Sequence, residues 1–327
     1  MEKEAEEIMI FAGSSSVDFV DKMCKYLGIE RGVSKTSHFR EGNTYVKIEE
    51  NVRNKDIYLV QTIGLDANNS FVELLFWIDS FKRSSARSVT VIMPYFSYAK
   101  ADKKDEPRVS IRARVCADCI EIAGADRVIT IDLHSPQIQG FFKKPVDNLY
   151  AHPILCEFIK TRNIPDLVVV SPDAGFARNA RRYASYLKVP VFICEKTRKD
   201  HSEQAEIRDL FGPVTIKNAL IVDDFTITCG TLIETANVVK QKGAEKIYAM
   251  VTHALLDEKA IEAFNKSDIC ELIVTDTVAN PLIVENKKIT TVSVAPFFAE
   301  AVKIIEDKGS LSSLFELLPE NLLKSCF

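Results

Sequence analysis

The sequence predicts an α/β protein in which mostly parallel sheets are flanked by helices. Short β-rich segments alternate with longer segments of helical periodicity from one end of the chain to the other. The chain has 327 residues and a hydrophobic composition of 46%, which is enough to build about two domains. The predicted strands are Ile8–Ala12, Ile57–Gln61, Val89–Met93, Val128–Asp132, Leu167–Ser171, Val191–Cys194, Ala219–Asp223, Ile247–His253 and Leu272–Asp276.

Helices are predicted between these strands. Apolar residues recur at helical spacing in Ser70–Ser84 and Thr231–Gly243, and the glycine that ends the second segment can cap a helix. We place a domain boundary near Pro153, after a turn-rich stretch. The expected parts are an N-terminal domain at 1–153, a C-terminal domain at 154–294 and a helical segment at 295–327 that is broken at Gly309 and packs back on the core.

A short internal similarity is consistent with two tandem domains. Residues 124–128 read Gly-Ala-Asp-Arg-Val and run to His134, while residues 243–247 read Gly-Ala-Glu-Lys-Ile and run to His253 at the same spacing. Each copy predicts a helix end, a turn and a strand. Either a duplication or a generic helix-to-strand turn accounts for the match.

Charge and composition exclude several classes of protein. The net charge of −4 provides no general basic surface for nucleic acid, and no apolar run is long enough to cross a bilayer. The acidic first residues lack the order of a secretion signal. The eight cysteines are scattered, several within apolar runs, which suits reduced thiols. We therefore expect a soluble, cytoplasmic protein that binds neither nucleic acid nor membrane.

The segment Leu220–Leu232 carries the most informative chemistry. An apolar strand runs into Asp223 and Asp224, then into a turn rich in hydroxyl groups, and then into a helix. This order predicts that Thr228–Thr231 lies at a helix N-terminus, where backbone N–H groups and the helix dipole favour a phosphate. Carboxylates beside a sugar phosphate can accept hydrogen bonds from hydroxyls or bind magnesium through water. A helix cap after a buried strand would explain one of these residues, but not all of them.

This segment resembles the phosphoribosyl-diphosphate binding motif of phosphoribosyltransferases and ribose-phosphate pyrophosphokinases. The rest of the chain resembles the second family alone, as a divergent member, from about residue 8 to residue 281. The matching segments are Phe11–Ser15, Val52–Arg53, Glu73–Leu75, Pro94–Ala99, Asp102–Lys104, Gly124–Asp126, Asp132–His134, Gln137–Phe142, Val146–Tyr150 and Ser171–Gly175.

The resemblance implies two tandem phosphoribosyltransferase-like domains and a magnesium-dependent transfer of pyrophosphate from ATP to ribose 5-phosphate. By resemblance, ATP binds the N-terminal domain and ribose 5-phosphate the C-terminal domain, and members usually assemble from dimers into hexamers, so we expect a homo-oligomer. The implied residues are Lys196 and Arg198 for catalysis; Asp223, Asp224, Thr228, Cys229, Gly230 and Thr231 for ribose 5-phosphate; Phe39, Glu41, Asn43, Lys100, Asp102 and Lys103 for ATP; and His134, Asp173 and Asp132 for magnesium.

The local sequence around these residues agrees with such roles. Asp132 and His134 are separated by one residue where a strand stops, so both side chains point to the same side if the strand persists. The polar and basic segment Cys194–His201 shows no apolar periodicity, which predicts a mobile loop. Lysine and arginine on such a loop can neutralise charge on a transferring phosphoryl group, and no strong general base is required.

Several positions depart from the family pattern. Ile227 stands where the family usually has an acid that contacts ribose hydroxyls, and Asn43 replaces a common glutamate. Lys100 and Ala101 replace Arg-Gln, and Phe176 replaces a glycine. Pro136 and Asn51 stand where the family's regulatory phosphate site usually has serines. These departures keep two alternatives open: a non-catalytic regulatory paralogue that binds catalytic subunits, and a salvage phosphoribosyltransferase.

Overall fold

The computed structural model describes residues 8–198, 205–211, 216–316 and 318–327, without the side chains of 195–211, 315 and 316. The chain folds into two compact units. The first holds the chain up to Tyr150 together with Thr277–Ala279 and Ala295–Ser310. The second holds Ala151–Asp276, Asn280–Val294 and Leu311–Phe327. The C-terminal segment after residue 294 is therefore shared between the units.

The first unit is built on a five-stranded sheet in which all neighbouring strands are parallel. Its central strands are buried on both faces, which explains their continuous apolar sequences. The strand order is β1 (Met9–Ala12), β4 (Asp56–Val60), β5 (Ser88–Met93), β6 (Arg127–Ile131) and β7 (Val146–Leu149).

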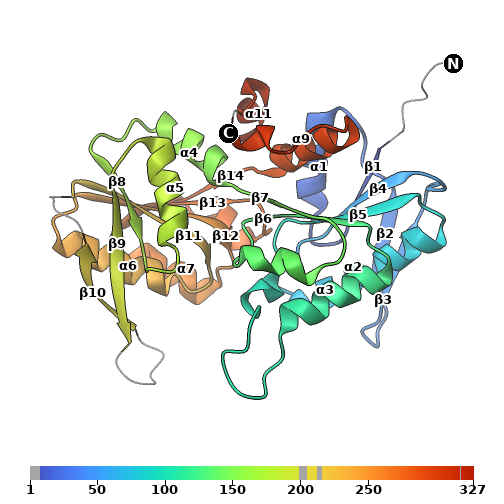
Figure 1. Ribbon diagram of the computed structural model, residues 1–327, viewed down its shortest axis with the longest axis horizontal. Helices are drawn as coiled ribbons and strands as arrows, with labels where there is room; N and C mark the ends of the chain where they lie inside the picture. Colours follow the sequence, from blue (N-terminus) through green and yellow to red (C-terminus); the bar gives the residue numbers. More distant parts are fainter. Residues whose placement is uncertain (1–7, 199–204, 212–215, 317) are drawn as a thin grey trace. The chain divides into compact units, whose positions relative to one another are not determined.

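Helices cover both faces of this sheet (Figure 1). One face carries α2 (Ala67–Arg83) and α3 (Arg112–Ala123), and the other carries α1 (Val17–Leu27) and α9 (Ala295–Glu306). Phe19 of α1 and Phe298 of α9 meet edge to face with ring centroids 5.6 Å apart. Two short 3₁₀ helices, η1 (Ser97–Lys100) and η2 (Pro136–Phe141), follow β5 and β6.

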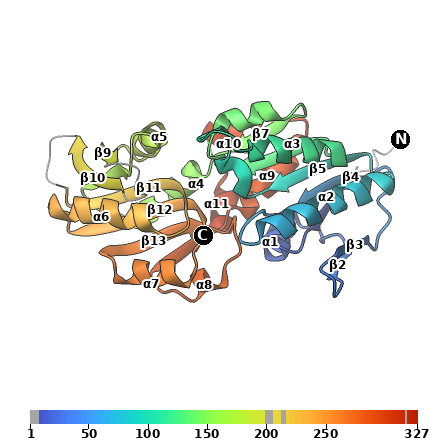
Figure 2. The ribbon, with the colours of Figure 1, turned by 90° about the horizontal axis from the view of Figure 1, so that it is seen from below.

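A separate hairpin of β2 (Ser34–His38) and β3 (Thr44–Ile48) lies beside α2 (Figure 2). A buried carboxylate ties these parts together. Glu73 is 2% exposed and accepts hydrogen bonds from the Ser14 amide (2.9 Å) and hydroxyl, from Thr36 Oγ1 (3.0 Å) and from Trp77 Nε1 (3.1 Å). One side chain of α2 thus holds the loop after β1 and the base of the hairpin.

The second unit is built on a seven-stranded sheet; among its described residues, β9 and β10 pair antiparallel and the other neighbouring strands pair parallel. In spatial order the strands are β10 (Ala205–Phe211), β9 (Val191–Arg198), β8 (Leu167–Ser171), β11 (Asn218–Thr226), β12 (Lys246–Ala254), β13 (Ile269–Thr275) and β14 (Ile289–Val292). One face carries α4 (His152–Thr161) and α5 (Ala177–Leu187), and the other carries α6 (Gly230–Gln241) and α7 (Glu258–Lys266) (Figure 1). Three short helices complete the unit: α8 (Pro281–Val284), α10 (Ser313–Glu316) and α11 (Glu320–Cys326).

The predicted fold class is confirmed, and each predicted strand overlaps an observed one. The prediction of a loop at Cys194–His201 is wrong for Cys194–Arg198, because these residues extend β9 and pair with β10; residues 199–201 lie outside the described part. Apolar periodicity could not reveal this extension, since an antiparallel ladder needs only backbone hydrogen bonds. Within the described ranges, no helix is both long and apolar enough to span a membrane.

Candidate active site

The predicted phosphate turn connects β11 to α6 in the second unit. Cys229 lies at the N-cap in a left-handed conformation with φ of 58°, and α6 begins at Gly230. The hydroxyl of Thr226 accepts from the Cys229 amide (3.2 Å), and the hydroxyl of Thr228 accepts from the Gly230 amide (3.3 Å). The helix dipole and the amides of its first turn therefore face a turn that is already shaped by hydroxyl groups.

The turn begins later than the sequence suggests. The predicted strand ends at Asp223, but β11 continues to Thr226, whose side chain is buried. Thr226 is therefore part of the strand end and not of a solvated turn. Thr228 is exposed, whereas the Cys229 side chain is buried and burial raises the pKa of its thiol to about 11. Cys229 can therefore contribute its backbone to a ligand, but not a thiolate.

Two consecutive acids lie on β11 just before this turn. Asp223 is partly buried and Asp224 is buried. Burial raises the pKa of Asp223 above its ordinary value, and the carboxyls of Asp224 and Asp173 raise it further. The Asp224 amide donates to Asp223 Oδ1 (3.0 Å), and the Phe225 amide donates to Asp224 Oδ1 (2.9 Å). This mutual repulsion between carboxyls would be relieved by a hydroxyl donor or a cation.

Asp173 lies in the loop between β8 and α5, and β8 is the parallel neighbour of β11. Its Oδ1 accepts from the Phe176 amide (3.0 Å), and its carbonyl accepts from the Ser171 hydroxyl (2.8 Å). A Cβ atom at Gly175 would lie 3.1 Å from Asp173 Oδ1, so a larger residue would crowd the carboxylate. The structure thus brings Asp173 to the same edge of the sheet as the β11 acids, as expected for parallel strands.

The other two predicted metal ligands lie in the first unit, after β6. The strand ends at Ile131, and Asp132 adopts a left-handed conformation with φ of 44°. The expectation that an extended strand would align Asp132 with His134 is therefore wrong. Asp132 is partly buried and His134 is exposed. A left-handed aspartate is tolerated but uncommon, and such backbone strain is frequent at functional sites.

The residues predicted to hold ATP occupy two segments of the first unit. Phe39 and Asn43 flank the hairpin tip, where the Phe39 amide donates to the Asn43 carbonyl (2.8 Å) and Gly42 has φ of 92°. The Phe39 side chain is 54% exposed and packs edge to face on Tyr45 with centroids 6.1 Å apart. Glu41 is exposed at the same tip.

The second ATP segment follows β5. Lys100 ends η1 and is partly buried, while Ala101 is buried. Asp102 is partly buried and Lys103 is exposed. The assignment of these residues to ATP stays a prediction.

The predicted catalytic residues lie on β9, where Lys196 is opposite Ile207 of β10 and Arg198 is opposite Ala205. Their side chains fall outside the described residues. In the part of the chain that is described, no three His, Cys, Asp or Glu side chains form a cluster arranged to hold a metal ion.

Sequence reasoning missed Thr226 and Ser171, whose hydroxyls shape the two loops that carry the acids. Both residues precede a turn by a few positions, and a hydroxyl at such a position commonly accepts or donates a local backbone hydrogen bond. That pattern was the available indication of their structural role.

Comparison with known proteins identifies the family of this chain. The family model for the N-terminal domain of ribose phosphate pyrophosphokinase matches residues 8–124, and the model for the phosphoribosyl synthetase-associated domain matches residues 203–316. The ribose-phosphate pyrophosphokinase of Bacillus caldolyticus is 40% identical over 310 residues, which cover 95% of this chain and 98% of that protein. The ribose-phosphate pyrophosphokinase of Campylobacter jejuni is 40% identical over 306 residues, covering 94% and 98%.

A solved structure gives the same result. The crystal structure of phosphoribosylpyrophosphate synthetase from Mycobacterium smegmatis matches with a TM-score of 0.86 and 33% identity, over 93% of this chain and 100% of that one. The sequence similarity covers almost the whole length of the relatives and is not confined to the phosphate turn, which argues against a salvage transferase. The chain belongs to the ribose-phosphate pyrophosphokinase family.

Proposed function

We propose that this protein is a magnesium-dependent ribose-phosphate pyrophosphokinase. It transfers pyrophosphate from ATP to the 1-hydroxyl of ribose 5-phosphate and releases AMP and phosphoribosyl diphosphate. The observation that carries the proposal is the connection between β11 and α6, in which the N-terminus of α6 follows two consecutive acids near the end of β11, Asp223 and Asp224. Such a turn offers amide donors to a phosphate and acceptors to the hydroxyls of the same sugar.

In this proposal the substrate phosphate binds Thr228–Thr231 and the ribose hydroxyls donate to Asp223 and Asp224. Burial and the neighbouring carboxyls raise the pKa of Asp223, whereas a hydrogen bond from a ribose hydroxyl would stabilise its charged form, so sugar binding and ionisation of this acid favour each other. In this proposal the bound phosphate and ribose position the 1-hydroxyl, which attacks the β-phosphorus of ATP in line while AMP leaves. Positioning of this kind supplies a large share of phosphoryl-transfer catalysis.

Asp173 and Asp132 carry the carboxylate oxygens that magnesium prefers, and magnesium usually keeps several waters as well. Asp173 retains one oxygen beyond its bond to the Phe176 amide, and its charge already disfavours ionisation of Asp223. We assign Asp173, Asp132 and His134 to the metal that accompanies the ATP phosphates. When bound, the metal neutralises charge on the phosphate oxygens.

Two cations of the chain complete the proposal. Lys196 and Arg198 neutralise the negative charge that grows on the transferred group and on the leaving oxygen. This electrostatic role depends on charge at a fixed position and requires no proton transfer. Adenine is assigned to Phe39, whose exposed ring offers a stacking face, and the polar groups of Glu41, Asn43, Lys100, Asp102 and Lys103 are assigned to the rest of ATP.

One assay tests the function. Purified protein is incubated with ATP, magnesium and ribose 5-phosphate, and AMP is measured with and without added phosphate. Formation of AMP that depends on ribose 5-phosphate supports the proposal. Binding of ribose 5-phosphate without AMP under any phosphate condition would favour the regulatory paralogue.

Two further properties belong to this proposal. We infer a homo-oligomer built from dimers, which analytical ultracentrifugation of the purified chain would measure. We also place the protein in the cytoplasm, in agreement with its reduced-thiol composition, and cell fractionation would test this location.

A further inference from the structure

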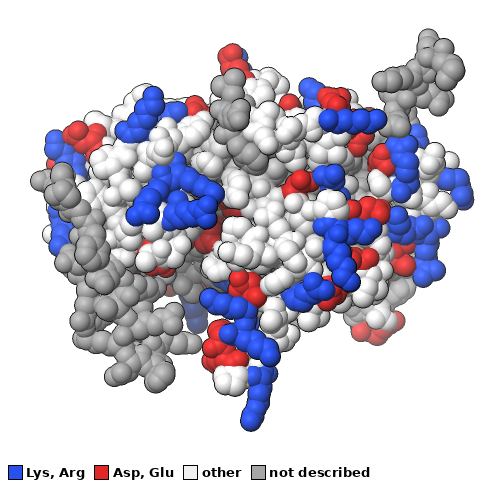
Figure 3. All heavy atoms as spheres, viewed as in Figure 1, with Lys and Arg blue, Asp and Glu red and all other residues white. Residues whose placement is uncertain are grey.

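The turn between β6 and η2 carries two of the residues assigned to the metal of ATP, Asp132 and His134. Strands β5 and β6 are parallel neighbours, so the segments that follow them leave the sheet at the same edge. The segment after β5 contains the other cluster assigned to ATP, and Figure 3 shows Lys and Arg side chains on its loop between η1 and α3. The position of the β6–η2 turn therefore matters for any nucleotide held at this edge.

Two hydrogen bonds to β7 fix the backbone of this turn. The Asp132 amide donates to the Leu149 carbonyl (3.0 Å), and the Leu133 amide donates to Oδ1 of Asn148 (3.1 Å). Successive amides of an extended strand point in opposite directions, so both bonds to β7 can form because Asp132 is left-handed, with φ of 44°. The Leu133 side chain is buried in the core shared with α2 and α3. The carboxamide of Asn148 thus holds the chain in its bent path.

Asn148 is an unfavourable residue for its position if stability alone is considered. It is 8% exposed, and its oxygen must face the Leu133 amide because that amide needs an acceptor. Within the described ranges, its Nδ2 then has no hydrogen-bond partner. A buried donor without a partner is destabilising, and an apolar side chain of similar size would avoid this loss. The bond to the turn therefore explains the asparagine better than packing does.

Thr130 of β6 provides a comparison inside the same sheet. It is the register partner of Asn148, so the two side chains lie on the same face. Thr130 is 2% exposed, and its hydroxyl also has no partner in the part of the chain that the structure describes. The two residues share a face, a buried position and an unpaired polar atom, but Asn148 is the one that bonds to the turn.

We propose that Asn148 is a positioning residue for magnesium-bound ATP. Its carboxamide holds the Leu133 amide and so fixes the turn that carries Asp132 on one side of Leu133 and His134 on the other. A residue that orients metal ligands without touching the metal commonly changes metal affinity by about 10–100-fold when it is replaced. The roles of Asp132 and His134 rest on the proposed function, whereas the hold of Asn148 on the turn does not.

Two buried substitutions test the role of Asn148. Asn148→Leu removes the acceptor and keeps a similar volume, and the matched control Thr130→Val removes the unpaired hydroxyl beside it. In the ligand-free chain, hydrogen exchange followed by mass spectrometry should be at least about tenfold faster at Leu133 in Asn148→Leu, because its amide has lost its partner. Calorimetry with ATP and magnesium should show at least about tenfold weaker binding. The affinity for ribose 5-phosphate should stay unchanged, and Thr130→Val should match the parent in all three measurements.

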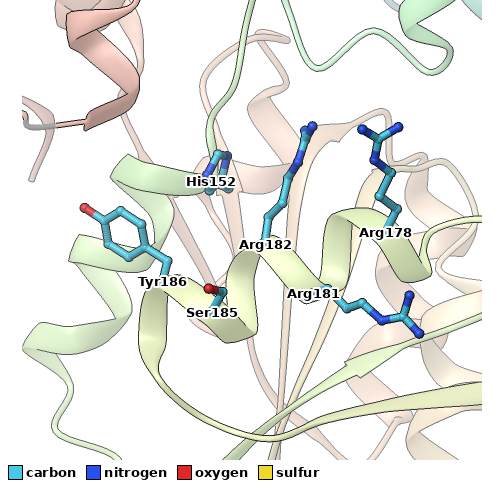
Figure 4. A pocket seen from close by; sticks show the side chains of 6 residues that line it. All are labelled: His152, Arg178, Arg181, Arg182, Ser185 and Tyr186. Carbon is cyan, nitrogen blue, oxygen red and sulfur yellow. The ribbon is translucent and has the colours of Figure 1, made fainter.

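ATP that binds elsewhere does not confuse this comparison. In the second unit, three arginines line part of a pocket of about 470 Å³ beside α5. Figure 4 shows Arg181 on the opposite side of α5 from Arg178 and Arg182, so the three cations do not converge on one phosphate group. Any weak attraction of ATP to this surface is independent of residue 148. It is therefore the same in the parent and in Asn148→Leu, and the difference between their affinities reports on the turn.

Unchanged exchange at Leu133, or unchanged affinity for magnesium-bound ATP, would overturn the proposal. An equal loss in Thr130→Val, or an equal loss of ribose 5-phosphate affinity in Asn148→Leu, would show a general structural role and would overturn it as well. Absence of magnesium-bound ATP binding by the parent would count against both this inference and the proposed function. A parent that binds both substrates but forms no AMP would contradict the proposed reaction alone, and the binding measurements would still decide the role of Asn148. If circular dichroism shows that Asn148→Leu is unfolded, Asn148→Ala is judged by the same criteria.

Discussion

Replacement of Ile227 by aspartate is expected to tighten the binding of ribose 5-phosphate. Ile227 lies between β11 and α6 and is 42% exposed, so a carboxylate there would stay hydrated. A charge-assisted hydrogen bond to a ribose hydroxyl contributes about 1.5–3 kcal/mol. Repulsion from Asp223 and Asp224 opposes it by about 1 kcal/mol at a solvated site. The net gain of about 1 kcal/mol predicts a KM for ribose 5-phosphate lowered roughly fivefold.

The same change has a moderate cost in stability. Full burial of an isoleucine contributes about 1.5–3 kcal/mol, and this side chain is only partly buried. A loss of about 1 kcal/mol lowers the melting temperature by roughly 2–4 °C in a domain of this size. The control Ile227→Asn removes the same apolar contacts without adding charge, so it should lose similar stability and gain less affinity. Steady-state kinetics and thermal denaturation provide both readouts. A raised KM for ribose 5-phosphate would refute the reasoning, because the lowered melting temperature is expected in either case.

Three further predictions follow from the proposed function. Lys196→Ala or Arg198→Ala should lower turnover at least about a hundredfold with little change in ribose 5-phosphate affinity; kinetics that show a loss confined to KM would contradict this role. Asp224→Asn keeps the acceptor for the Phe225 amide but loses the charge. Calorimetry should therefore show weaker ribose 5-phosphate binding, while the circular dichroism spectrum stays unchanged. Unchanged affinity and rate would show that Asp224 has a structural role only. Pro136 lacks a hydroxyl and an amide donor, and Asn51 Oδ1 already accepts from the Arg53 amide at 3.1 Å. Assays across phosphate and ADP concentrations should therefore show weak activation by phosphate and weak inhibition by ADP. Strong dependence on millimolar phosphate would count against this prediction.

The elements that could be predicted from the sequence are those that are buried and therefore consist of a recognisable pattern of apolar residues. Strands β4 and β5 are covered on both faces, so their residues form nearly continuous apolar runs. The end of the helix before Gly243 could be predicted because glycine commonly follows a helix C-terminus. In the structure Gly243 has φ of 100°, as such a position requires. No residue of strands β2 and β3 is fully buried, so their sequences contain no continuous apolar run.

The site was predictable at the level of residue type and less so at the level of geometry. The order of strand, acids, hydroxyls and helix located the phosphate turn, because each residue type performs a local task there. Neither the burial of Thr226 nor the left-handed backbone of Asp132 could be predicted, since both depend on neighbouring strands. The Asp132 amide donates to the carbonyl of Leu149 on β7, a strand that the sequence analysis did not predict.

The hydrogen bonds of Glu73 make three segments of the first unit depend on one another. Its carboxylate is satisfied only when the loop after β1, helix α2 and strand β2 are all in place. Loss of the donor from β2 would leave a buried acceptor with fewer partners, a state that costs free energy in proportion to its burial. The hairpin that presents Phe39 is therefore not an independently moving arm. It is part of one cooperative folding unit with the edge of the sheet, and its position is fixed from inside the protein.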